Sequence, residues 1–322
     1  MAIGVTLGDA SGVGPEILVR AYLAGTLPPG TVVIGDRSVV DYCVDTLGVQ
    51  ATVRSASTLT DIDTTALNVF DMGILSREDI RPGELSRASG GAALSYLERA
   101  VQAALNSEIE AIVTLPMNKE ATRLSAPDFT GHTDVIAQAC GIDSYTLSLI
   151  SDTLVVAHVS AHVSLREAIE RVETRRVLEV IRLAGDACRR LGRGGRIAVM
   201  GLNPHAGEGG AFGDEEIRLI RPAVEQAREE GMNVTGPLPP DTVFMRATKG
   251  AFDAVVCMYH DQGHIGMKTL GLDTTVNVTL GLPIVRTSVD HGTAFDIAYR
   301  GVASTGSFDR ACALALTLAR NK

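Results

Sequence analysis

The sequence has no long hydrophobic run and no surplus of basic residues. No apolar stretch approaches the roughly 20 residues that a membrane-spanning helix needs, and residues 1–7 lead into a strand-like segment rather than a signal peptide. A formal net charge of -9 argues against a general nucleic-acid or anionic-membrane binder, because either would need a basic face. These absences predict a cytoplasmic protein that binds neither nucleic acid nor a membrane.

Clustered cysteines are also absent. The five cysteines are scattered and form no CxxC pair, which argues against a disulfide framework and against a zinc site made of cysteines. Tryptophan is missing as well, but its absence excludes no function. The 322 residues, 45% of them hydrophobic, exceed the size at which one core stops growing. The chain is therefore expected to form two domains or one large α/β unit.

Short apolar runs recur along the chain and predict buried strands of an α/β fold. They cover residues 3–7, 31–35, 111–115, 146–150, 154–159, 197–202, 254–258, 274–280 and 284–289. Apolar residues at helical spacing predict helices over about 38–47, 86–105 and 174–191, and a terminal helix from about residue 308. Residues 50–83 have a weaker pattern, with strand candidates at 51–54 and 67–70, and are expected to be largely irregular.

The segment CMYHDQGHIGMK, residues 257–268, gathers many chemically active side chains in one place. It follows a predicted strand and supplies imidazole, carboxylate, amide and ammonium groups from His260, Asp261, Gln262, His264 and Lys268. In open α/β sheets ligands bind beyond the carboxyl ends of the strands, so we expect a polar site here. The alternative, that His260 is an ordinary loop residue, stays open on this motif alone.

Two further histidines, His162 and His205, also follow predicted strands. His162 precedes a helix opened by Ser164, with Glu167 three residues later in a capping-box pattern. His205 lies in NPHAGEGGAFGDEE, whose small residues suit a loop that folds over a ligand. Together with His260 they would supply the three imidazoles of a catalytic divalent-metal site. Spacing alone leaves open whether the three lie together.

Some polar residues have a simpler structural explanation. His158 falls within the apolar alternation of its strand and is predicted to be structural. The acidic run 214–216 is interpreted as the first turn of a helix, where negative charge is favoured. Asp241 follows two prolines at or near a helix cap, and capping alone would explain it.

Glycines and basic residues indicate that the chain binds an anion. GDASGVGPEI, residues 8–17, has the pattern of a strand-to-helix turn whose free N–H groups could approach a phosphate or nucleotide, although a turn needed only for close packing is an equal alternative. His132 in GHTDVIAQACG is expected at a helix N-terminus. Lys268 follows the predicted strand 254–258, and Arg286 lies in the predicted strand 284–289. A small phosphorylated or carboxylated substrate is therefore expected.

Nine segments covering Gly8 to Ala298 resemble the 4-hydroxythreonine-4-phosphate dehydrogenase (PdxA-like) family. In order they are GDASGVGPEI, LPMNKEA, GHTDVIA, HVSLREAI, GLNPHAGEGG, GPLPPDT, YHDQGHIGMK, NVTLGLP and RTSVDHGTAFDIA. The resemblance implies a two-lobed isocitrate and isopropylmalate dehydrogenase-like fold, in which residues 1–322 form one catalytic unit with discontinuous lobes and an active site in the cleft between them. HGTAFDIA resembles the HGxAxDIA segment with which isopropylmalate dehydrogenases hold NAD, which explains why GxGxxG is absent.

The resemblance also implies roles for individual residues. A divalent metal (zinc, magnesium, cobalt or manganese) would be bound by ligands from both subunits of a homodimer, namely His162, His205 and His260. The phosphorylated substrate would be held by His132, Thr133, Lys268, Asn277 and Arg286. NAD, with NADP still open, would contact Gly12, Gly14, His291, Gly292 and Asp296. Lys268 is the candidate for proton transfer, and Asp241 and Asp261 are candidates for orienting metal ligands.

The implied activity is oxidation of a 3-hydroxy-acid 4-phosphate, followed by loss of carbon dioxide. Biosynthetic members usually read YHDQGLPxLK, whereas His264 resembles the catabolic branch, which converts D-erythronate or D-threonate 4-phosphate to dihydroxyacetone phosphate. His264 is therefore a candidate neighbour of a C2 hydroxyl group. Three alternatives stay open: a dihydrodiol carboxylate dehydrogenase, a metal-dependent enzyme without a redox step, and a binding protein for a phosphorylated metabolite.

Overall fold

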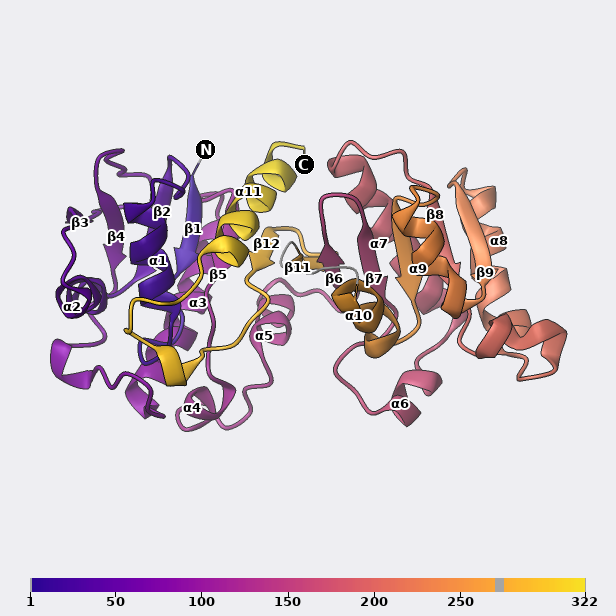
Figure 1. The fold of residues 1–322 in the computed structure, drawn as a ribbon, viewed down its shortest axis with the longest axis horizontal. Helices are drawn as coiled ribbons and strands as arrows, with labels where there is room; N and C mark the ends of the chain where they lie inside the picture. The colour runs from indigo at the N-terminus through magenta and orange to yellow at the C-terminus, as the bar shows by residue number, and fades with distance from the viewer. Residues whose placement is uncertain (1, 270–274, 322) are drawn as a thin grey trace. The chain divides into compact units, whose positions relative to one another are not determined.

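The computed structural model describes residues 2–269 and 275–321. The chain divides into two compact units. Unit 1 comprises Met1–Asp143 and Leu282–Arg320, and unit 2 comprises Ser144–Gly281 and Asn321–Lys322. Both units combine strands with helices, so the predicted α/β class is confirmed (Figure 1). The predicted location of the active site between two lobes stays a prediction.

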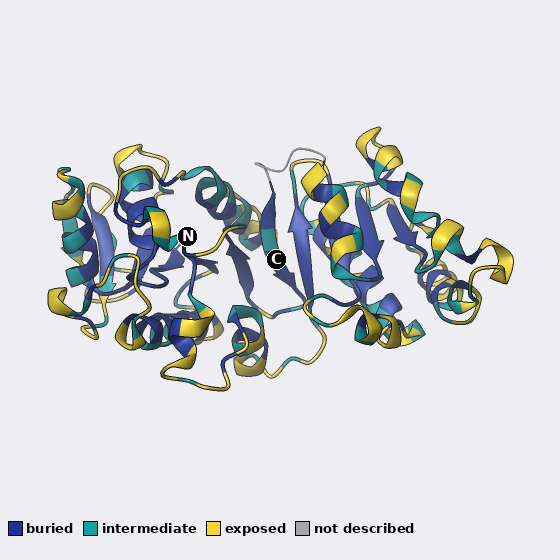
Figure 2. Cartoon of the chain, turned by 60° about the horizontal axis from the view of Figure 1, so that its bottom comes forward, coloured by how far each residue is buried: buried dark blue, intermediate teal, exposed yellow. Residues whose placement is uncertain are grey.

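The strands of unit 1 are parallel to their neighbours and follow the order β3-β4-β2-β1-β5-β12. Their bounds are Ile3–Thr6 (β1), Thr31–Gly35 (β2), Val53–Ser55 (β3), Leu67–Asp71 (β4), Ala111–Thr114 (β5) and Val285–Ser288 (β12). β1, β2, β5 and β12 are buried along their whole length, as their dark blue colour in Figure 2 shows. Continuous apolar runs are typical of parallel strands covered on both faces, which is why the sequence predicted these strands to within one residue at each end.

The helices of unit 1 are Gly14–Leu23 (α1), Arg37–Leu47 (α2), Arg87–Leu105 (α3), Lys119–Arg123 (α4), His132–Ala139 (α5) and Gly306–Arg320 (α11), with short turns at Arg77–Asp79 (η1) and Phe295–Ile297 (η4). α3 packs against β1, β2 and β5, and α11 packs against β5 and β12. α3 begins after Ser86, whose Oγ accepts a hydrogen bond from the Ser89 N–H at 3.2 Å.

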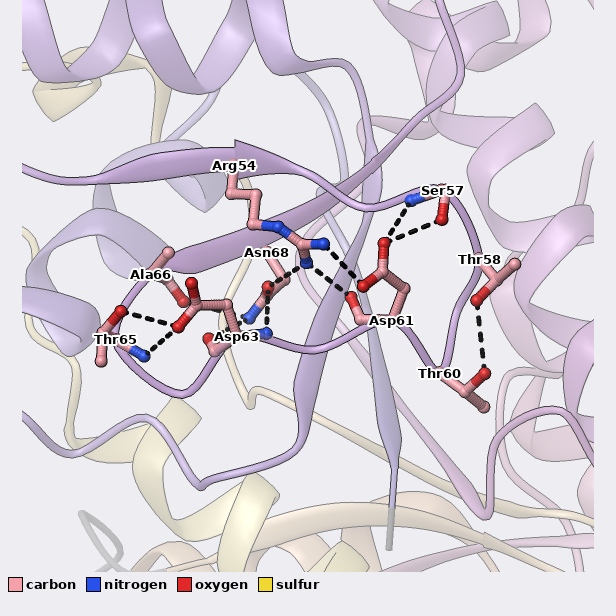
Figure 3. A network of polar contacts seen from close by, with 9 residues as sticks. All are labelled: Arg54, Ser57, Thr58, Thr60, Asp61, Asp63, Thr65, Ala66 and Asn68. Carbon is pink, nitrogen blue, oxygen red and sulfur yellow. Dashed lines mark hydrogen bonds and ion pairs between the residues drawn. The ribbon is translucent and has the colours of Figure 1, made fainter.

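Residues 50–83 are more ordered than the sequence pattern suggested, because polar side chains organise them (Figure 3). Arg54 on β3 donates to Asp61 Oδ1 at 2.6 Å and to Asn68 Oδ1 at 3.3 Å. Asp61 also accepts hydrogen bonds from the backbone and side chain of Ser57. The hydrogen bond from Arg54 is the largest of the contacts that lower the pKa of Asp61 to about 2. Such contacts leave no hydrophobic periodicity, so β3 was only a weak candidate in the sequence.

The strands of unit 2 follow the order β11-β6-β7-β10-β8-β9. β6 is antiparallel to β11 and to β7, and the remaining pairs are parallel. Their bounds are Thr146–Ile150 (β6), Val155–His158 (β7), Ile197–Met200 (β8), Val234–Leu238 (β9), Ala254–Cys257 (β10) and Val276–Leu280 (β11). Residue 274, the first of predicted strand 274–280, lies outside the described residues.

The helices of unit 2 are Leu165–Glu170 (α6), Thr174–Arg190 (α7), Arg221–Glu229 (α8), Pro240–Thr248 (α9) and His260–Thr269 (α10), with irregular helical segments at Pro204–Gly210 (η2) and Glu216–Ile220 (η3). α7 packs against β7, β8, β10 and β11. A core made mainly of aliphatic side chains lies between the sheet, α9 and α10, and includes Leu149, Val156, Val243, Val255 and Met267. Within the residues that the structure describes, no helix has the length and apolar character that crossing a membrane requires.

Two elements of unit 2, β9 and α10, were not predicted, and glycine explains both. β9 contains Gly236 and Pro237, which are typical of loops. Both are tolerated here because β9 is an edge strand. α10 contains Gly263 and Gly266, which lower helix propensity. A Cβ atom at Gly263 would lie 2.3 Å from His158 Nε2, and one at Gly266 would lie 2.3 Å from the Phe244 ring. The helix needs these glycines because it packs closely on β7 and α9.

Candidate active site

Four histidines lie together in unit 2, and we call them the histidine cluster: His158, His162, His260 and His264. His260 stacks on His264 with ring centroids 3.6 Å apart, and the His162 ring lies 5.4 Å from that of His260. The buried His158 ring lies 4.9 Å from His264. Figure 1 shows α10, which carries two of the four, beside β7. The structure therefore brings together two of the three predicted metal ligands, His162 and His260.

Hydrogen bonds at the carboxyl ends of three strands position this cluster. The Val159 N–H donates to the Cys257 carbonyl at 2.8 Å, and Ser160 Oγ donates to the Met258 carbonyl at 3.1 Å, so the exits of β7 and β10 are joined. Gln262 Nε2 donates to the Gly201 carbonyl at 2.8 Å, and its Oε1 accepts from the Met258 N–H at 2.7 Å. Gln262 was predicted to be one of the chemically active side chains, and in the structure it connects the ends of β8 and β10.

The two aspartates predicted to orient metal ligands differ in their contacts. Asp261 Oδ1 lies 2.7 Å from His260 Nδ1. A carboxylate accepts the Nδ1 proton and leaves the Nε2 lone pair of His260 available to a metal, which is the arrangement expected of a ligand-orienting residue. Asp241 lies exposed in the first turn of α9, and the described residues give it no hydrogen bond or ion pair. Its predicted role stays a prediction.

The third predicted ligand, His205, lies in an unusual turn. Five consecutive residues, His205 to Gly209, have positive φ angles between 43° and 75°. The His205 ring contacts Phe212, with centroids 6.2 Å apart, and its Nδ1 lies 3.6 Å from the Glu208 carboxylate. Within residues 2–269 and 275–321 of one chain, no group of three or more His, Cys, Asp or Glu residues is arranged to hold a metal ion. The complete trio therefore stays a prediction.

Glu216 fixes the backbone next to His205. This role was not predicted from the sequence. Its carboxylate is buried and accepts hydrogen bonds from the N–H groups of Leu202 and Asn203, each at 2.7 Å. It also accepts one from Asn203 Nδ2 at 3.0 Å. The acidic run 214–216 does lead into a helix, as predicted, but a favourable helix-dipole interaction is only part of its role. No periodicity distinguishes Glu216 from its acidic neighbours, so this contact could not be predicted from the sequence.

Unit 1 contains a second group of candidate site residues, which we call the basic cluster: the predicted residues His132 and Arg286, together with Lys119. Arg286 is buried, and its Nη2 donates to Thr114 Oγ1 at 2.7 Å. Burial lowers the pKa of Arg286 to about 10. Burial, followed by the charges of Arg286 and Lys119, lowers the pKa of His132 to about 3. Positive charge held in a desolvated position favours an anionic ligand, and Lys119 of LPMNKEA joins the predicted residues here.

The remaining predicted substrate residues occupy different elements. Thr133 is the second residue of α5, next to His132. Lys268 is exposed in the last turn of α10, and its charge is among the smaller causes that lower the pKa of His264, after burial and His260. Asn277 lies on β11, and its buried Oδ1 has no hydrogen-bond partner among the described residues. An unsatisfied carbonyl oxygen at this position is available to a ligand donor.

The predicted cofactor residues of unit 1 fall into two groups. The Val13 N–H donates to the Thr293 carbonyl at 2.9 Å, so the glycine-rich turn and segment 291–296 touch. A Cβ at Gly12 would lie 2.9 Å from Thr293 Cβ, and one at Gly14 would lie 2.6 Å from the Leu7 carbonyl oxygen. Close packing therefore accounts for both glycines. By contrast, a Cβ at Gly292 would meet no atom within 4 Å, and His291 and Asp296 are exposed.

Asp9, in the same glycine-rich turn, makes folding depend on pH. Burial raises the pKa of Asp9 from 3.8 to about 6, although its Oδ1 accepts a hydrogen bond from the Ser11 N–H at 2.9 Å. The folded protein then binds this proton more tightly than the unfolded chain. The stability that Asp9 contributes is complete below about pH 4 and is lost as the pH rises through about 6.

An Asp9→Asn variant is therefore expected to unfold at a higher temperature than the wild type at pH 8 and at a similar temperature at pH 4. The gain at pH 8 is at most about 3 kcal/mol in the free energy of unfolding. Thermal unfolding followed by circular dichroism at both pH values measures it. Equal differences at the two pH values would show that Asp9 does not titrate in this range.

Comparisons with known proteins identify the family. The family model described as "Pyridoxal phosphate biosynthetic protein PdxA" matches residues 29–315. The 4-hydroxythreonine-4-phosphate dehydrogenase of Beijerinckia indica is 44% identical over 312 residues, covering 96% of this chain and 92% of the relative. The D-threonate 4-phosphate dehydrogenase of Salmonella typhimurium is 42% identical over 332 residues, covering 98% of each protein.

Solved structures agree with this result. A 4-hydroxythreonine-4-phosphate dehydrogenase from Klebsiella pneumoniae superposes with a TM-score of 0.89 at 40% identity, covering 99% of both chains. A terephthalate 1,2-cis-dihydrodioldehydrogenase from Burkholderia xenovorans superposes with a TM-score of 0.70 at 30% identity, covering 96% of this chain and 95% of that one. A beta-decarboxylating dehydrogenase from Thermococcus kodakarensis superposes with a TM-score of 0.52 at 14% identity, covering 96% of this chain and 82% of that one. At this identity the match shows a similar fold and nothing more. The predicted isocitrate dehydrogenase-like fold is confirmed, and the chain belongs to the PdxA family that its motifs predicted.

Proposed function

We propose that this protein is a dehydrogenase that oxidises a hydroxy-acid 4-phosphate with NAD and a divalent metal, and that the 3-oxo product then loses carbon dioxide. The match to dehydrogenases of such phosphates over nearly the whole chain carries this proposal. The substrate is 4-phospho-hydroxy-L-threonine or a sugar-acid 4-phosphate, either D-erythronate or D-threonate 4-phosphate. His264 favours the sugar acids, because it supplies a polar group to distinguish a C2 hydroxyl from an amine.

The donor set of the histidine cluster fits a divalent metal. The His162 and His260 rings are adjacent, and Asp261 occupies His260 Nδ1 so that Nε2 remains available to a metal. His205 would complete the set. When bound, the metal acts as a Lewis acid that lowers the pKa of the substrate hydroxyl and stabilises developing enolate charge, and NAD supplies the hydride acceptor. Three imidazoles do not by themselves determine which metal is bound, so a titration with each metal distinguishes zinc, cobalt, manganese and magnesium.

The basic cluster fits the phosphate group. The guanidinium of Arg286 is fixed by Thr114, so it loses little conformational freedom when it binds a phosphate. His132 at the start of α5 and Lys119 add positive or donor groups at the same place. Binding there would position the hydroxy-acid end of the substrate, since a rigidly held non-reacting group orients the reacting one. Lys268 is the proposed proton-transfer residue, and Asn277 Oδ1 a proposed acceptor for a substrate donor.

Segment 291–296 is the proposed contact for the adenosine part of NAD. The open space at Gly292 and the exposure of His291 and Asp296 allow a ligand to approach this backbone. Gly12 and Gly14 would act indirectly, by letting the glycine-rich turn pack against Thr293. NADP remains an alternative cofactor. A cytoplasmic location is part of the proposal and is tested by cell fractionation.

A homodimer with a shared metal site is the proposed assembly. Large apolar side chains are exposed on the elements that carry or adjoin the predicted metal ligands, namely Leu165, Ile169, Phe212, Ile217 and Ile265. Single exposed apolar residues are common, but their presence on each element that carries or adjoins a predicted ligand supports an interface there. The partner would be a second copy of the chain, whose histidine completes the ligand set.

Hybrid dimers test the shared site. His205→Ala and His260→Ala chains are each expected to be inactive alone. If the two ligands of one site come from different subunits, co-expression should restore up to about a quarter of wild-type activity, since half of randomly paired dimers are mixed and each holds one intact site. Sedimentation analysis checks that both variants are dimers. Absence of any restored activity in mixed dimers would contradict a shared site.

Formation of NADH by the purified protein with metal present tests the activity itself. Three substrates are compared: 4-phospho-hydroxy-L-threonine, D-erythronate 4-phosphate and D-threonate 4-phosphate. Turnover that chelation abolishes and added metal restores supports the proposal. A terephthalate cis-dihydrodiol is the fourth substrate, because the Burkholderia xenovorans structure shares this fold at 30% identity. NADH from the diol alone would replace the proposal by that activity, and no NADH from any of the four would contradict a redox role.

A further inference from the structure

The buried imidazole of His158 has two nitrogens, but among the described residues just one of them has a hydrogen-bond partner. It is the last residue of β7 and is 1% exposed. Its Nδ1 lies 2.9 Å from the Leu147 carbonyl oxygen. Because a carbonyl oxygen can only accept, Nδ1 carries the proton, and in the neutral ring Nε2 is a lone-pair acceptor. Nε2 is buried and has no hydrogen-bond partner among the described residues.

An imidazole is an unfavourable choice for a purely structural position here. The other residues of β7, Val155 to Ala157, are buried and apolar. A buried nitrogen without a partner costs about 1–3 kcal/mol, so an apolar side chain of similar size would suit the strand better. Burial also lowers the pKa of His158 to about 3, which keeps the ring neutral. The strand alone therefore gives no reason for a histidine at this position.

The surroundings of Nε2 point to α10. Gly263 lies so close that a Cβ there would be 2.3 Å from Nε2, and the next residue, His264, places its ring 4.9 Å from that of His158 at an angle of 38°. His264 is itself buried and is otherwise restrained by His260, through ring stacking at 3.6 Å and through its Nδ1, which lies 3.2 Å from the His260 carbonyl oxygen. His158 and His260 are thus the two rings that His264 touches.

We propose that His158 is a positioning residue that fixes the ring orientation of His264 and thereby sets the preference for the C2 substituent of the substrate. This inference rests on the proposed function, in which His264 lies beside the substrate C2 group. With the His264 ring held between contacts from β7 and from His260, one nitrogen is presented consistently to a hydroxyl group. Without His158 the ring loses its contact from β7 and is restrained by His260 alone, so the distinction between hydroxyl and amine weakens.

A His158→Leu variant tests the kinetic consequence. Its melting temperature is expected to equal or exceed that of the wild type, because leucine removes the unsatisfied nitrogen. The ratio of kcat/KM for D-erythronate 4-phosphate to that for 4-phospho-hydroxy-L-threonine is expected to fall by about tenfold, the size of effect that one misplaced polar contact produces. A purely structural role would change the melting temperature and both kcat/KM values together, and an unchanged ratio would overturn the proposal.

A double-mutant cycle links this effect to His264. In a His264→Leu background, the His158→Leu change is expected to leave the substrate ratio unaltered, because the ring that it positions is gone. If His158→Leu lowers the ratio equally in both backgrounds, His158 acts by another route and the proposal is wrong.

Nuclear magnetic resonance of the imidazole nitrogens tests the positioning role without any substrate. The chain has seven histidines, so their side-chain 15N resonances can be assigned by single substitutions. In His158→Leu the His264 resonances are expected to shift, while those of the exposed His291 stay unchanged. Unaltered His264 resonances would overturn the proposal. Failure of the wild type to form NADH would count against the proposed function alone, since this measurement stands without it.

Discussion

An alanine in place of His260 is expected to lower kcat/KM about a thousandfold, while the protein stays folded. His260 offers the clearest metal-ligand geometry in the chain, because Asp261 holds its Nδ1 and leaves Nε2 available. In the proposed site, losing one of three imidazoles would remove much of the stabilisation of developing negative charge that a bound metal would provide, and about 4 kcal/mol corresponds to a thousandfold change in rate. Steady-state kinetics across a metal titration measure the loss.

Two further variants of α10 separate ligand loss from damage to the helix. Asp261→Asn keeps the imidazole but weakens its orientation, so a loss of about 10–100-fold in metal affinity is expected. Thr269→Ala, at the exposed end of the same helix, is expected to retain wild-type activity. Calorimetric titration with the metal distinguishes the three. If His260→Ala binds metal as tightly as the wild type, His260 is not a ligand.

Loss of Glu216 is expected to destabilise the protein more than loss of any exposed carboxylate. In Glu216→Ala the N–H groups of Leu202 and Asn203 lose their acceptor in a partly buried position. Each unsatisfied donor costs about 1–3 kcal/mol, so we expect the free energy of unfolding to fall by about 2–4 kcal/mol. Metal-dependent activity should fall as well, because the chain that leads into His205 is no longer fixed.

The neighbouring Asp214 provides the matched control for Glu216. Its carboxylate is exposed and pairs with Arg218 at 2.7 Å, and solvent screens such a pair strongly. Asp214→Ala is therefore expected to change the free energy of unfolding far less than Glu216→Ala and to leave activity intact. Urea unfolding of both variants gives the comparison. Equal destabilisation by the two would show that the buried contacts of Glu216 do not hold the segment.

The sequence predicted elements whose pattern follows from burial on both faces. The strands β1, β2 and β5 are continuous runs of apolar, mostly β-branched residues, and their bounds came out within one residue. α10 escaped prediction for the opposite reason. Its Gly263 is unfavourable for a helix in isolation, and only the contact with His158 on another strand makes it necessary. A requirement that arises from tertiary contact leaves no local pattern.

In the candidate site, too, the sequence predicted residues that follow an apolar run but not contacts that form only on folding. His162 and His260 could be named because each follows an apolar run, and the structure places their rings together. The role of Glu216 and the contact between His158 and His264 could not be predicted, because they depend on which backbone groups and rings face these side chains after folding. Lys119 was visible within a motif, but its proximity to His132 is a property of the folded unit 1.

Unit 1 consists of two separate stretches of the chain, and this affects the order in which the two units can fold during synthesis. Residues 144–281 leave the ribosome as one continuous piece that contains all strands of unit 2. β5, by contrast, waits for β12 and α11, which are made after residues 144–281. Until then β5 presents an open edge to which other chains can pair. The second unit can therefore complete its fold before the first, and a chain released early would keep a folded unit 2 beside an unfinished unit 1.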